Sequence, residues 1–324
     1  MISADKLNSP EMTAVIIGSK PNTYTFTKAL AENILETEGA GLPISIIRPS
    51  IVAAAWRDPE PGGGRKVSGR TSPGLCFSGW IDNFNAATGV LAGAGKGILR
   101  TAFIKRDCVA DIVPVDLCIN LMCVLAWKTA TTSTTSSIPV YNCTSGAVNT
   151  LTWGLVEREG LKIIRNNPYS GVLWYPGGSF KENYYANRFC QLMFHYGPAH
   201  LLDIILRILG KKPFLVKVSS LMQKSTAALA TFTTNSWEWS HGNMDKLWAE
   251  LSEEDRQLFH FDIRELDWIP YLETYVKVHQ TYFIISYIHP LYITYIIKMN
   301  IYFRALESSC LRKIRRRYLQ QKEI

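Results

Sequence analysis

A helix that runs directly into an apolar, β-branched segment is the feature that most limits how this chain can fold. Residues 22–38 are typical of a helix, because Asn22 or Thr23 can cap its start and Gly39 and Gly41 can end it. The next segment is LPISIIRPSIV, which is typical of a buried strand. A helix, a short glycine link and a strand make one step of a layered α/β sheet.

The remainder of the chain predicts more of this α/β region and then a helical region. A turn or short strand, a helix from about residue 114 to 128 and a short strand at VYNCTS extend the α/β region to about residue 150. Beyond residue 180 the pattern becomes helical, with a break expected at Gly197-Pro198 and caps expected at Asn243 and Ser252. Aromatic residues at helical intervals are interpreted as core: Trp248, Phe259, Phe261 and Trp268.

The net charge of +8 is concentrated at one end of the chain and therefore says little about the rest. Residues 304–324 contain seven Lys/Arg and two Glu, a pattern more typical of a solvated or membrane-facing segment than of a nucleic-acid module. The seven cysteines are scattered without a CxxC pair, and the histidines form no HExxH pattern. We therefore expect no nucleic-acid partner, no disulfide framework and no metal site, and we interpret His195 and His200 as structural.

Tyr24 and Lys28 lie four positions apart at the start of the predicted helix, and this spacing places both side chains on one face. An ammonium group near a phenol favours the phenolate, so such a tyrosine can exchange a proton with a carbonyl group, and the lysine can also reach a nucleotide ribose. Spacing alone is weak evidence, because about one such pair is expected by chance in this composition, and Tyr318 and Lys322 form a second. Only Tyr24 and Lys28 stand in front of a predicted strand, which favours them as the catalytic pair.

A series of sequence blocks, all in one order, carries a family resemblance. The first half contains PNTYTFTKALAE, GLPISIIRPSIV, GWIDN, GAGKGILRT and ADIVPVD, and the second half contains FTTNSWEW and NMDKLWAELSEEDRQLFHFDIRELDWIPYLETYV. These blocks cover nearly all of residues 10–280 and resemble the alcohol-forming fatty acyl-CoA reductases, especially those of insects. The blocks of the second half are similar to the helical C-terminal domain of that family, often called the sterile domain.

The resemblance implies an α/β fold, in which an incomplete Rossmann-type sheet of the extended short-chain dehydrogenase/reductase kind is followed by an α-helical C-terminal domain. Residues 1–175 would be the C-terminal part of the reductase domain, with an unusual insertion at 62–78, and residues 180–280 would be the sterile domain. Residues 281–324 would add an apolar segment and a basic tail. Because the apolar run 281–303 is long enough to cross a bilayer, membrane association is expected, with a true span as one of two alternatives.

The resemblance also implies a function, the NADPH-dependent reduction of a long-chain fatty acyl-CoA, through an aldehyde, to a fatty alcohol and CoA, as in wax or pheromone synthesis. Tyr24 would be the proton donor, Lys28 would hold the ribose and tune Tyr24, and the backbone at Pro49 and Ile51 would seat the nicotinamide carboxamide. The VPVD sequence at 113–116 would line the substrate side or position the last sheet elements. The family implies an intracellular membrane, peroxisomal or of the endoplasmic reticulum, while the oligomeric state is not predicted.

The sequence departs from the family pattern in the part that binds the nucleotide. Pyrophosphate binding in a dinucleotide fold uses a glycine-rich turn, and no G-x-x-G-x-x-G occurs in the sequence. The GAGKG stretch at 93–97 lacks the Walker spacing and is interpreted as a structural loop. By the resemblance the nucleotide-binding half would precede residue 1, so these 324 residues alone are expected to bind NADPH weakly or not at all.

Three hypotheses stay open at this point. The first is the C-terminal portion of a fatty acyl-CoA reductase. The second is a non-catalytic, membrane-associated lipid-binding remnant of that family. The third is another extended dehydrogenase, such as a sterol-type enzyme, which would share the Tyr/Lys pair but not the LFHFDIRELDW block.

Overall fold

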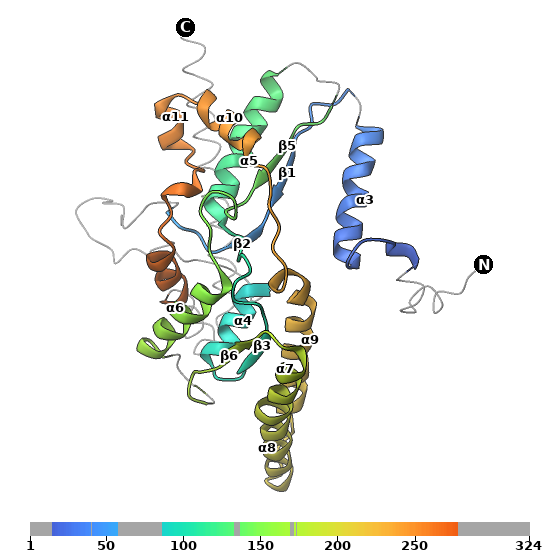
Figure 1. Ribbon diagram of the computed structural model, residues 1–324, viewed down its shortest axis with the longest axis vertical. Coiled ribbons are helices and arrows are strands. Elements are labelled where there is room, and N and C mark those ends of the chain that lie inside the picture. The colour runs from blue at the N-terminus through green and yellow to red at the C-terminus, as the bar shows by residue number, and fades with distance from the viewer. Residues whose placement is uncertain are drawn as a thin grey trace. The chain divides into compact units, whose positions relative to one another are not determined.

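The computed structural model describes residues 15–39, 41–57, 86–132, 137–168, 172 and 174–277. The chain divides into two compact units: one contains the residues up to Arg48 with Leu125–Tyr141, and the other contains Pro49–Val124 with the residues from Asn142 onward. Figure 1 shows the helices and strands with their labels. The predicted insertion at 62–78 and the apolar segment and tail at 281–324 lie outside the described residues.

The helix α3 (Thr23–Glu38) confirms the first prediction from the sequence. Asn22 is the capping residue, because its side-chain Oδ1 accepts a hydrogen bond from Thr25 N at 2.9 Å. Gly39 ends the helix at the predicted position. Gly41 follows with φ +83°, a backbone conformation that glycine adopts without strain.

The segment predicted as one buried strand forms two short strands instead. β1 (Ile46–Pro49) pairs with β5 (Val140–Cys143), and β2 (Ile51–Ala53) runs parallel to β4 (Ile112–Pro114). A third pair, also parallel, joins β3 (Thr101–Phe103) to β6 (Ser179–Lys181). The short strand predicted at VYNCTS is thereby confirmed as β5.

The change of strand partner occurs at Ser50. Its N–H donates to Cys143 O at 3.0 Å, whereas the next N–H, that of Ile51, donates to Asp111 O at 3.0 Å. Pro49 has no N–H and cannot continue a ladder, which favours a break at this point. The strands are also less buried than predicted, since Pro49 is exposed and Ile51 is half-buried.

The GAGKG stretch is not a loop, because its first three residues are the end of α4 (Ala86–Gly95). Ile98 N donates to Gly93 O at 2.9 Å and Gly97 N donates to Ala94 O at 3.0 Å, which are the two hydrogen bonds of a Schellman helix end. Gly97 has φ +73°, a conformation that favours glycine at this place. The predicted structural role therefore belongs to a helix terminus.

Two further helices follow strands or turns of the α/β region. α5 (Val115–Thr131) begins directly after β4 and confirms the helix predicted from about residue 114. α6 (Trp153–Asn166) is capped by Thr152, whose Oγ1 accepts from Leu155 N at 3.3 Å. Its buried Ile163 and Ile164 pack with apolar side chains of the helical residues 268–277, namely Leu272 and Val276.

The predicted helical region contains α7 (Tyr184–Gln191), the π-helical turn η1 (Leu192–Tyr196), α8 (Gly197–Ile208), α9 (Leu215–Thr233), α10 (Gly242–Glu250), α11 (Glu253–Leu258) and the 3₁₀ turn η2 (Ile263–Glu265). The predicted break at Gly197-Pro198 is wrong: the chain stays helical because the π turn places Pro198 in the first turn of α8, where its missing N–H leaves no helical hydrogen bond unmade.

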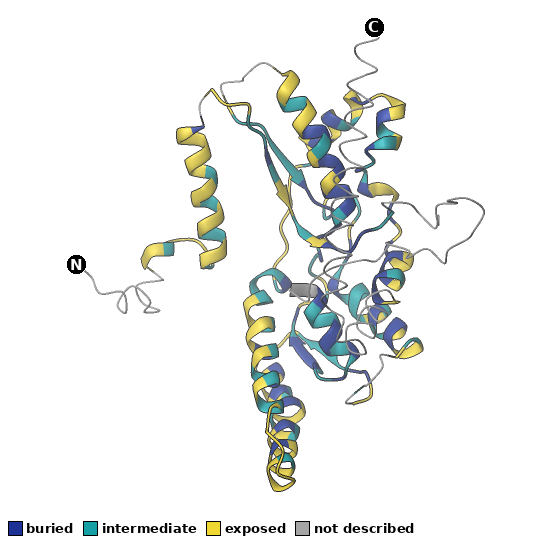
Figure 2. Ribbon diagram, turned by 180° about the vertical axis from the view of Figure 1, so that it is seen from behind, coloured by how far each residue is buried: buried dark blue, intermediate teal, exposed yellow. Residues whose placement is uncertain are grey.

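The two predicted caps and the aromatic core have different outcomes. Ser252 caps α11 as predicted, with Oγ accepting from Asp255 N at 3.2 Å. The cap predicted at Asn243 is wrong, because α10 begins one residue earlier and His241 occupies the N-cap position. The core interpretation of the aromatic residues is largely confirmed, since Phe259, Phe261 and Trp268 are buried and Trp248 is half-buried. Figure 2 shows this burial along the chain.

Candidate functional site

Tyr24 and Lys28 meet on one face of α3, as their spacing predicts. The Lys28 Nζ lies 5.7 Å from the centroid of the Tyr24 ring. The Tyr24 side chain is accessible, with 61 % of its surface exposed. An accessible phenol beside an ammonium group has the composition of a proton-donating pair, and the ammonium can stabilise negative charge on the phenol oxygen. The catalytic role of the pair stays a prediction.

The predicted nicotinamide seat lies in the other unit, where Pro49 and Ile51 flank the junction of β1 and β2. Between them, the Ser50 Oγ is buried and has no hydrogen-bond partner among the described residues. A buried hydroxyl without a partner is costly unless a ligand or water satisfies it. The segment therefore offers a polar group that suits a carboxamide, which sequence reasoning did not identify.

A buried loop follows β2 and is held by Asp116. Ala53, Ala54 and Ala55 are buried, and the chain then turns at Trp56 and Arg57. The Asp116 carboxylate, in the first turn of α5, accepts hydrogen bonds from Trp56 N at 3.0 Å and Arg57 N at 2.8 Å. Asp116, the last residue of VPVD, therefore fixes the loop that leaves β2, and the two roles predicted for VPVD stay predictions.

The helical residues 268–277 hold the same loop from another direction. The Tyr271 hydroxyl donates to Ala54 O at 2.7 Å, and the Tyr275 hydroxyl lies 2.8 Å from Thr88 Oγ1. Burial raises the pKa of Tyr271 well above its ordinary value, and burial raises the pKa of Tyr275 to about 12. Both phenols are therefore protonated at neutral pH and act as structural hydrogen-bonding groups rather than as proton donors to a substrate.

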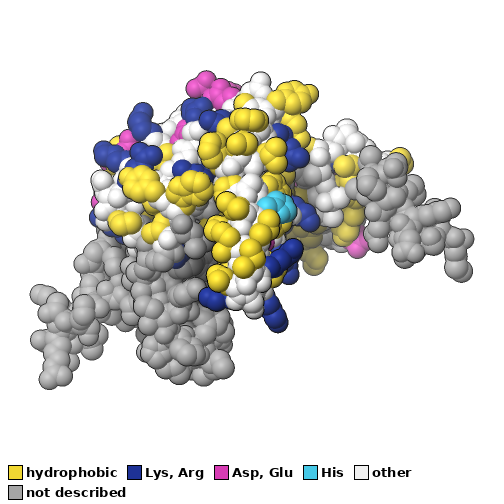
Figure 3. Space-filling view, turned by 90° about the horizontal axis from the view of Figure 1, so that it is seen from below, with side chains coloured by type: hydrophobic (Ala, Val, Ile, Leu, Met, Phe, Trp, Pro, Cys, Tyr) yellow, Lys and Arg dark blue, Asp and Glu magenta, His cyan; other side chains and the backbone are white. Residues whose placement is uncertain are grey.

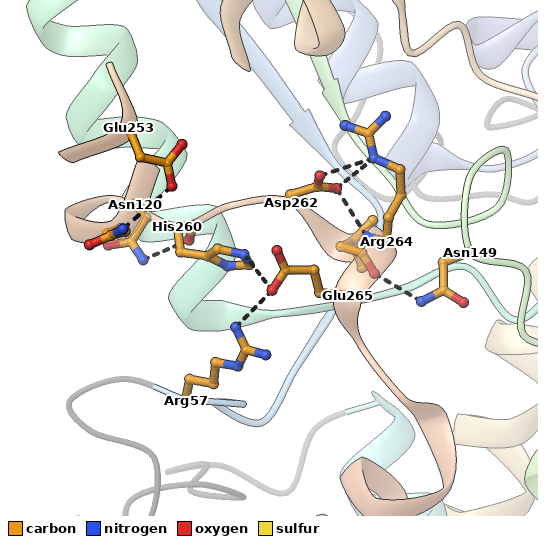
Figure 4. Close-up of polar contacts among 10 residues, drawn as sticks. Arg57, Asn120, Asn149, Glu253, His260, Asp262, Arg264 and Glu265 are labelled. Carbon is orange, nitrogen blue, oxygen red and sulfur yellow. Dashed lines mark hydrogen bonds and ion pairs between the residues drawn. The ribbon is translucent and has the colours of Figure 1, made fainter. Parts of the chain in front are cut away.

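Polar contacts also fasten residues 260–266 to the α/β region, as Figure 4 shows. Glu265 accepts from Arg57 Nη1 at 3.1 Å, and its other neighbour is the His260 Nε2 at 3.2 Å. Asn120 of α5 donates to His260 O at 2.8 Å, and Asn149 donates to Ile263 O at 2.8 Å. The LFHFDIRELDW block thus packs against the loop after β2, so the helical region supports the candidate cofactor segment.

A second aspartate clamps the neighbouring strands. The Asp111 Oδ1 accepts from Ser145 N at 2.7 Å and from Ser145 Oγ at 3.0 Å, and the same Ser145 Oγ accepts from Ile112 N at 3.2 Å. Ser145 is fully buried. These bonds tie the start of β4 to the turn after β5. The only signal for both aspartates in the sequence is their position at the two ends of a short apolar run.

The cysteines of the described part of the chain offer no reactive thiol pair or metal site. Cys118 Sγ lies 3.6 Å from Cys143 Sγ, both residues are buried, and both are free thiols. The hydrogen bond with Cys143, and then burial, raise the pKa of Cys118, so it stays a thiol. Among the described residues, no group of three or more His, Cys, Asp or Glu side chains is placed to hold a metal ion.

Within the part of the chain that the structure describes, no helix combines the length and the apolar character needed to cross a membrane. The apolar run predicted as membrane-associated, 281–303, lies outside that part.

The sequence is similar to known protein families and to individual proteins over most of its length. A family model for an NAD-binding domain, described as male sterility protein, matches residues 3–122, and a model for the sterile domain, with the same description, matches residues 194–285. The chain is 38 % identical over 265 residues to fatty acyl-CoA reductase 1 of Homo sapiens and 40 % identical over 265 residues to that of Gallus gallus. It is 37 % identical over 266 residues to fatty acyl-CoA reductase 2 of Bos taurus. Each match covers 82 % of this chain and 48 % of the relative.

The parallel strand pairs, the NAD-binding match and the helices that follow define a Rossmann-type α/β region followed by an α-helical region. The predicted fold class is confirmed in these terms. The chain belongs to the fatty acyl-CoA reductase family, which confirms the predicted resemblance. It spans about half the length of the curated relatives it matches.

Proposed function

We propose that the complete protein reduces a long-chain fatty acyl-CoA to a fatty alcohol and CoA, with NADPH as the hydride source. The relatives are named fatty acyl-CoA reductases, and their similarity extends over most of this chain. The observation that carries the proposal is the accessible Tyr24 beside Lys28 on α3. Reduction of a carbonyl group needs a proton on oxygen for each hydride on carbon, and this pair is suited to deliver it.

The proposed chemistry has two reductions. In the first, the thioester takes up one hydride and one proton and releases CoA as the thiol, which leaves the aldehyde. In the second, the aldehyde takes up a further hydride and proton and becomes the alcohol. In the aldehyde step the Tyr24 O–H bond breaks as the carbonyl oxygen gains the proton, and the Lys28 ammonium stabilises the charge left on the phenol oxygen.

NADPH, when bound, supplies the hydride in both reductions. Lys28 would hold the nicotinamide ribose, and the backbone at Pro49 and Ile51 would hold the carboxamide. The unpartnered Ser50 Oγ supports this assignment, because a carboxamide both donates and accepts hydrogen bonds. Asp116 and Tyr271 act as positioning residues that keep the loop after β2 in place.

A second candidate function is a non-catalytic, membrane-associated lipid-binding role. The observation that favours it is the exposed apolar surface of α7, α8 and α9. In either case we propose an intracellular membrane, peroxisomal or of the endoplasmic reticulum, as the location, and the long apolar run 281–303 supports that proposal. Fractionation of cells that express the tagged chain, with markers for both organelles, measures this directly.

The proposed reaction is tested on the chain joined to the nucleotide-binding half of a family relative. Hexadecanoyl-CoA is supplied with NADPH or NADH, and hexadecanol and free CoA are quantified. We expect two NADPH consumed for each alcohol formed, and a Tyr24→Phe turnover that is lower by about 10²–10⁴-fold.

The matched control is Tyr318→Phe, which removes the tyrosine of the second Tyr/Lys spacing and is expected to leave turnover unchanged. Undiminished alcohol formation by Tyr24→Phe would remove the pair from the mechanism. A soluble joined chain that forms no alcohol but still binds lipid vesicles would favour the second candidate function.

A further inference from the structure

The helices α7, η1, α8 and α9 form a projecting helical arm (Tyr184–Thr233), in which α8 packs against α9. Figure 1 shows the arm extending beyond the β3–β6 pair. Ile208 and Phe214 lie where α8 ends and α9 begins, so the connection between them is the tip of the arm. The tip, residues 208–214, has every residue exposed.

The arm buries polar side chains rather than apolar ones. Apart from Ala199, each of its buried residues is polar. In the first half the buried residues, Ala199 included, recur at every fourth position, which places them on one stripe of the continuous helix. The buried polar residues are Asn187, Gln191, His195, Asp203, Ser219, Gln223 and Thr233.

This polar interior is held by hydrogen bonds. The Asp203 carboxylate accepts from the N–H groups of residues 214, 215 and 216 at 3.0 Å each, so it caps α9 and closes the tip. His195 Nε2 accepts from Arg100 N at 2.8 Å, and its Nδ1 contacts the Gln223 side-chain amide. Asn187 Oδ1 accepts from Thr101 Oγ1 at 2.8 Å. With polar groups inside, many of the apolar side chains of the arm are exposed.

The outward face is unusually apolar for a surface that meets water. At the tip, Ile208 is 78 % exposed and Leu209 is 63 % exposed. Figure 3, a view from below, shows hydrophobic side chains gathered with Lys and Arg on this side of the molecule. A contiguous apolar patch with a polar rim marks a contact surface. Its further members are Phe189, Leu192, Met193, Phe194, Leu201, Leu202, Ile204, Ile205, Phe214 and Leu221.

The net positive charge of the arm indicates which kind of partner its apolar surface can contact. The arm contains six Lys/Arg, and its only acidic residue is Asp203, which is buried against the start of α9. Lys211 and Lys212 stand at the tip, between Leu209 and Phe214. Basic residues interleaved with exposed apolar ones complement an anionic lipid surface, where the cations meet phosphates and the apolar groups enter the acyl boundary.

We propose that the tip of the arm docks into the surface of a bilayer that contains anionic phospholipid. Ile208, Leu209 and Phe214 enter the boundary between headgroups and acyl chains, and Lys211 and Lys212 bind lipid phosphates. The polar interior and apolar exterior of the arm distinguish a lipid contact from an ordinary helical surface, because polar side chains face one another where the outside is hydrocarbon. This proposal does not depend on the proposed reaction.

The test measures vesicle binding of the full chain and of an Ile208→Asn/Leu209→Asn/Phe214→Asn variant by co-sedimentation over a range of lipid concentrations. The vesicles are phosphatidylcholine with about 30 % phosphatidylserine. The readout is the ratio of the two partition coefficients, because the 281–303 run can contribute equally to both. We expect binding of the variant to be weaker by about tenfold or more, since three apolar side chains no longer enter the bilayer.

The matched control is Ile119→Asn/Met122→Asn/Ile269→Asn, which changes three exposed apolar residues outside the arm and is expected to bind like the parent. Circular dichroism and the melting temperature confirm that each variant is folded. Equal binding of the tip variant and the parent chain overturns the proposal.

A charge-reversal variant tests the basic half of the contact. Lys211→Glu/Lys212→Glu is expected to lose about tenfold in binding to the anionic vesicles and little in binding to pure phosphatidylcholine. Lys105→Glu/Lys246→Glu is its control for net charge. If light scattering shows that the parent chain is a dimer and the tip variant a monomer, a second copy covers this surface and the proposal is overturned.

Discussion

The helix α5 and the helical arm bury opposite kinds of side chain. On α5, Leu117 and Leu121 are buried almost completely, and Val113 in the preceding strand is buried with them. On the arm, Asp203 and Gln223 are buried while Leu201 is 61 % exposed. Both regions are helical and both are rich in apolar residues, so composition alone does not separate them.

The difference teaches that the two regions are built for different surroundings. Burying apolar side chains away from water stabilises α5 and its neighbours by the ordinary hydrophobic effect. The arm gains little from that effect and depends on hydrogen bonds among buried polar groups, each of which stabilises modestly and is costly to leave unmade. An apolar surface outside such an interior is favourable only where another apolar phase meets it.

The largest expected effect contrasts one leucine from each region. Leu121→Ala removes a fully buried side chain and is expected to lower the free energy of unfolding by about 2–5 kcal/mol. Leu201→Ala removes an exposed side chain of the arm and is expected to change it by less than about 0.5 kcal/mol. Urea unfolding followed by circular dichroism measures both. A cost for Leu201→Ala close to that of Leu121→Ala would break the comparison.

An intermediate effect is expected inside the arm. Asn187→Leu makes the interior more apolar but leaves the buried Thr101 hydroxyl without its acceptor, so we expect a loss of about 1–3 kcal/mol. Adding Thr101→Val removes the stranded hydroxyl and is expected to recover part of the loss. The same unfolding assay measures the cycle. A stabilising Asn187→Leu would show that the polar interior is not what holds the arm.

The third expected effect is a pH dependence of the free energy of unfolding. Burial, and then the charge of Arg100, lower the pKa of His195 from 6.5 to about 4. Between these pH values the unfolded chain binds a proton at residue 195 that the folded chain does not. The contribution of His195 to the free energy of unfolding is therefore fully present above pH 6.5 and is lost as the pH falls toward 4. His195→Gln keeps an acceptor for Arg100 N and should make the free energy of unfolding, measured by urea unfolding at several pH values, change less between pH 6.5 and 4. The exposed His200, changed to Gln, is the control and should leave this pH dependence unchanged.

Local features of the fold follow from the sequence because their causes are local. The cap at Asn22, the glycine that ends α3 and the cap at Ser252 each depend on residues within one helical turn. The proximity of Tyr24 and Lys28 follows from the same helical geometry. These parts could therefore be predicted without knowledge of the rest of the molecule.

Other features depend on partners far along the chain. The partner change at Ser50 needs both β4 and β5 in place, and the Tyr271 bond to Ala54 O joins residues 217 positions apart. The sequence predicts the helical arm only as helical, because a mostly apolar stretch does not show which of its faces is buried. Polar residues at four of the five positions spaced by four from Asn187 to Asp203 are the sequence signal for the inner stripe.

The central claim is that the outer face of the arm belongs in contact with lipid, and hydrogen exchange of the full chain tests it most directly. Backbone amides are followed with and without vesicles that contain about 30 % phosphatidylserine. We predict slower exchange at residues 205–217 on the vesicles and unchanged exchange in α10 and α11. Vesicle-bound chain whose tip exchanges as fast as it does in solution would contradict the account.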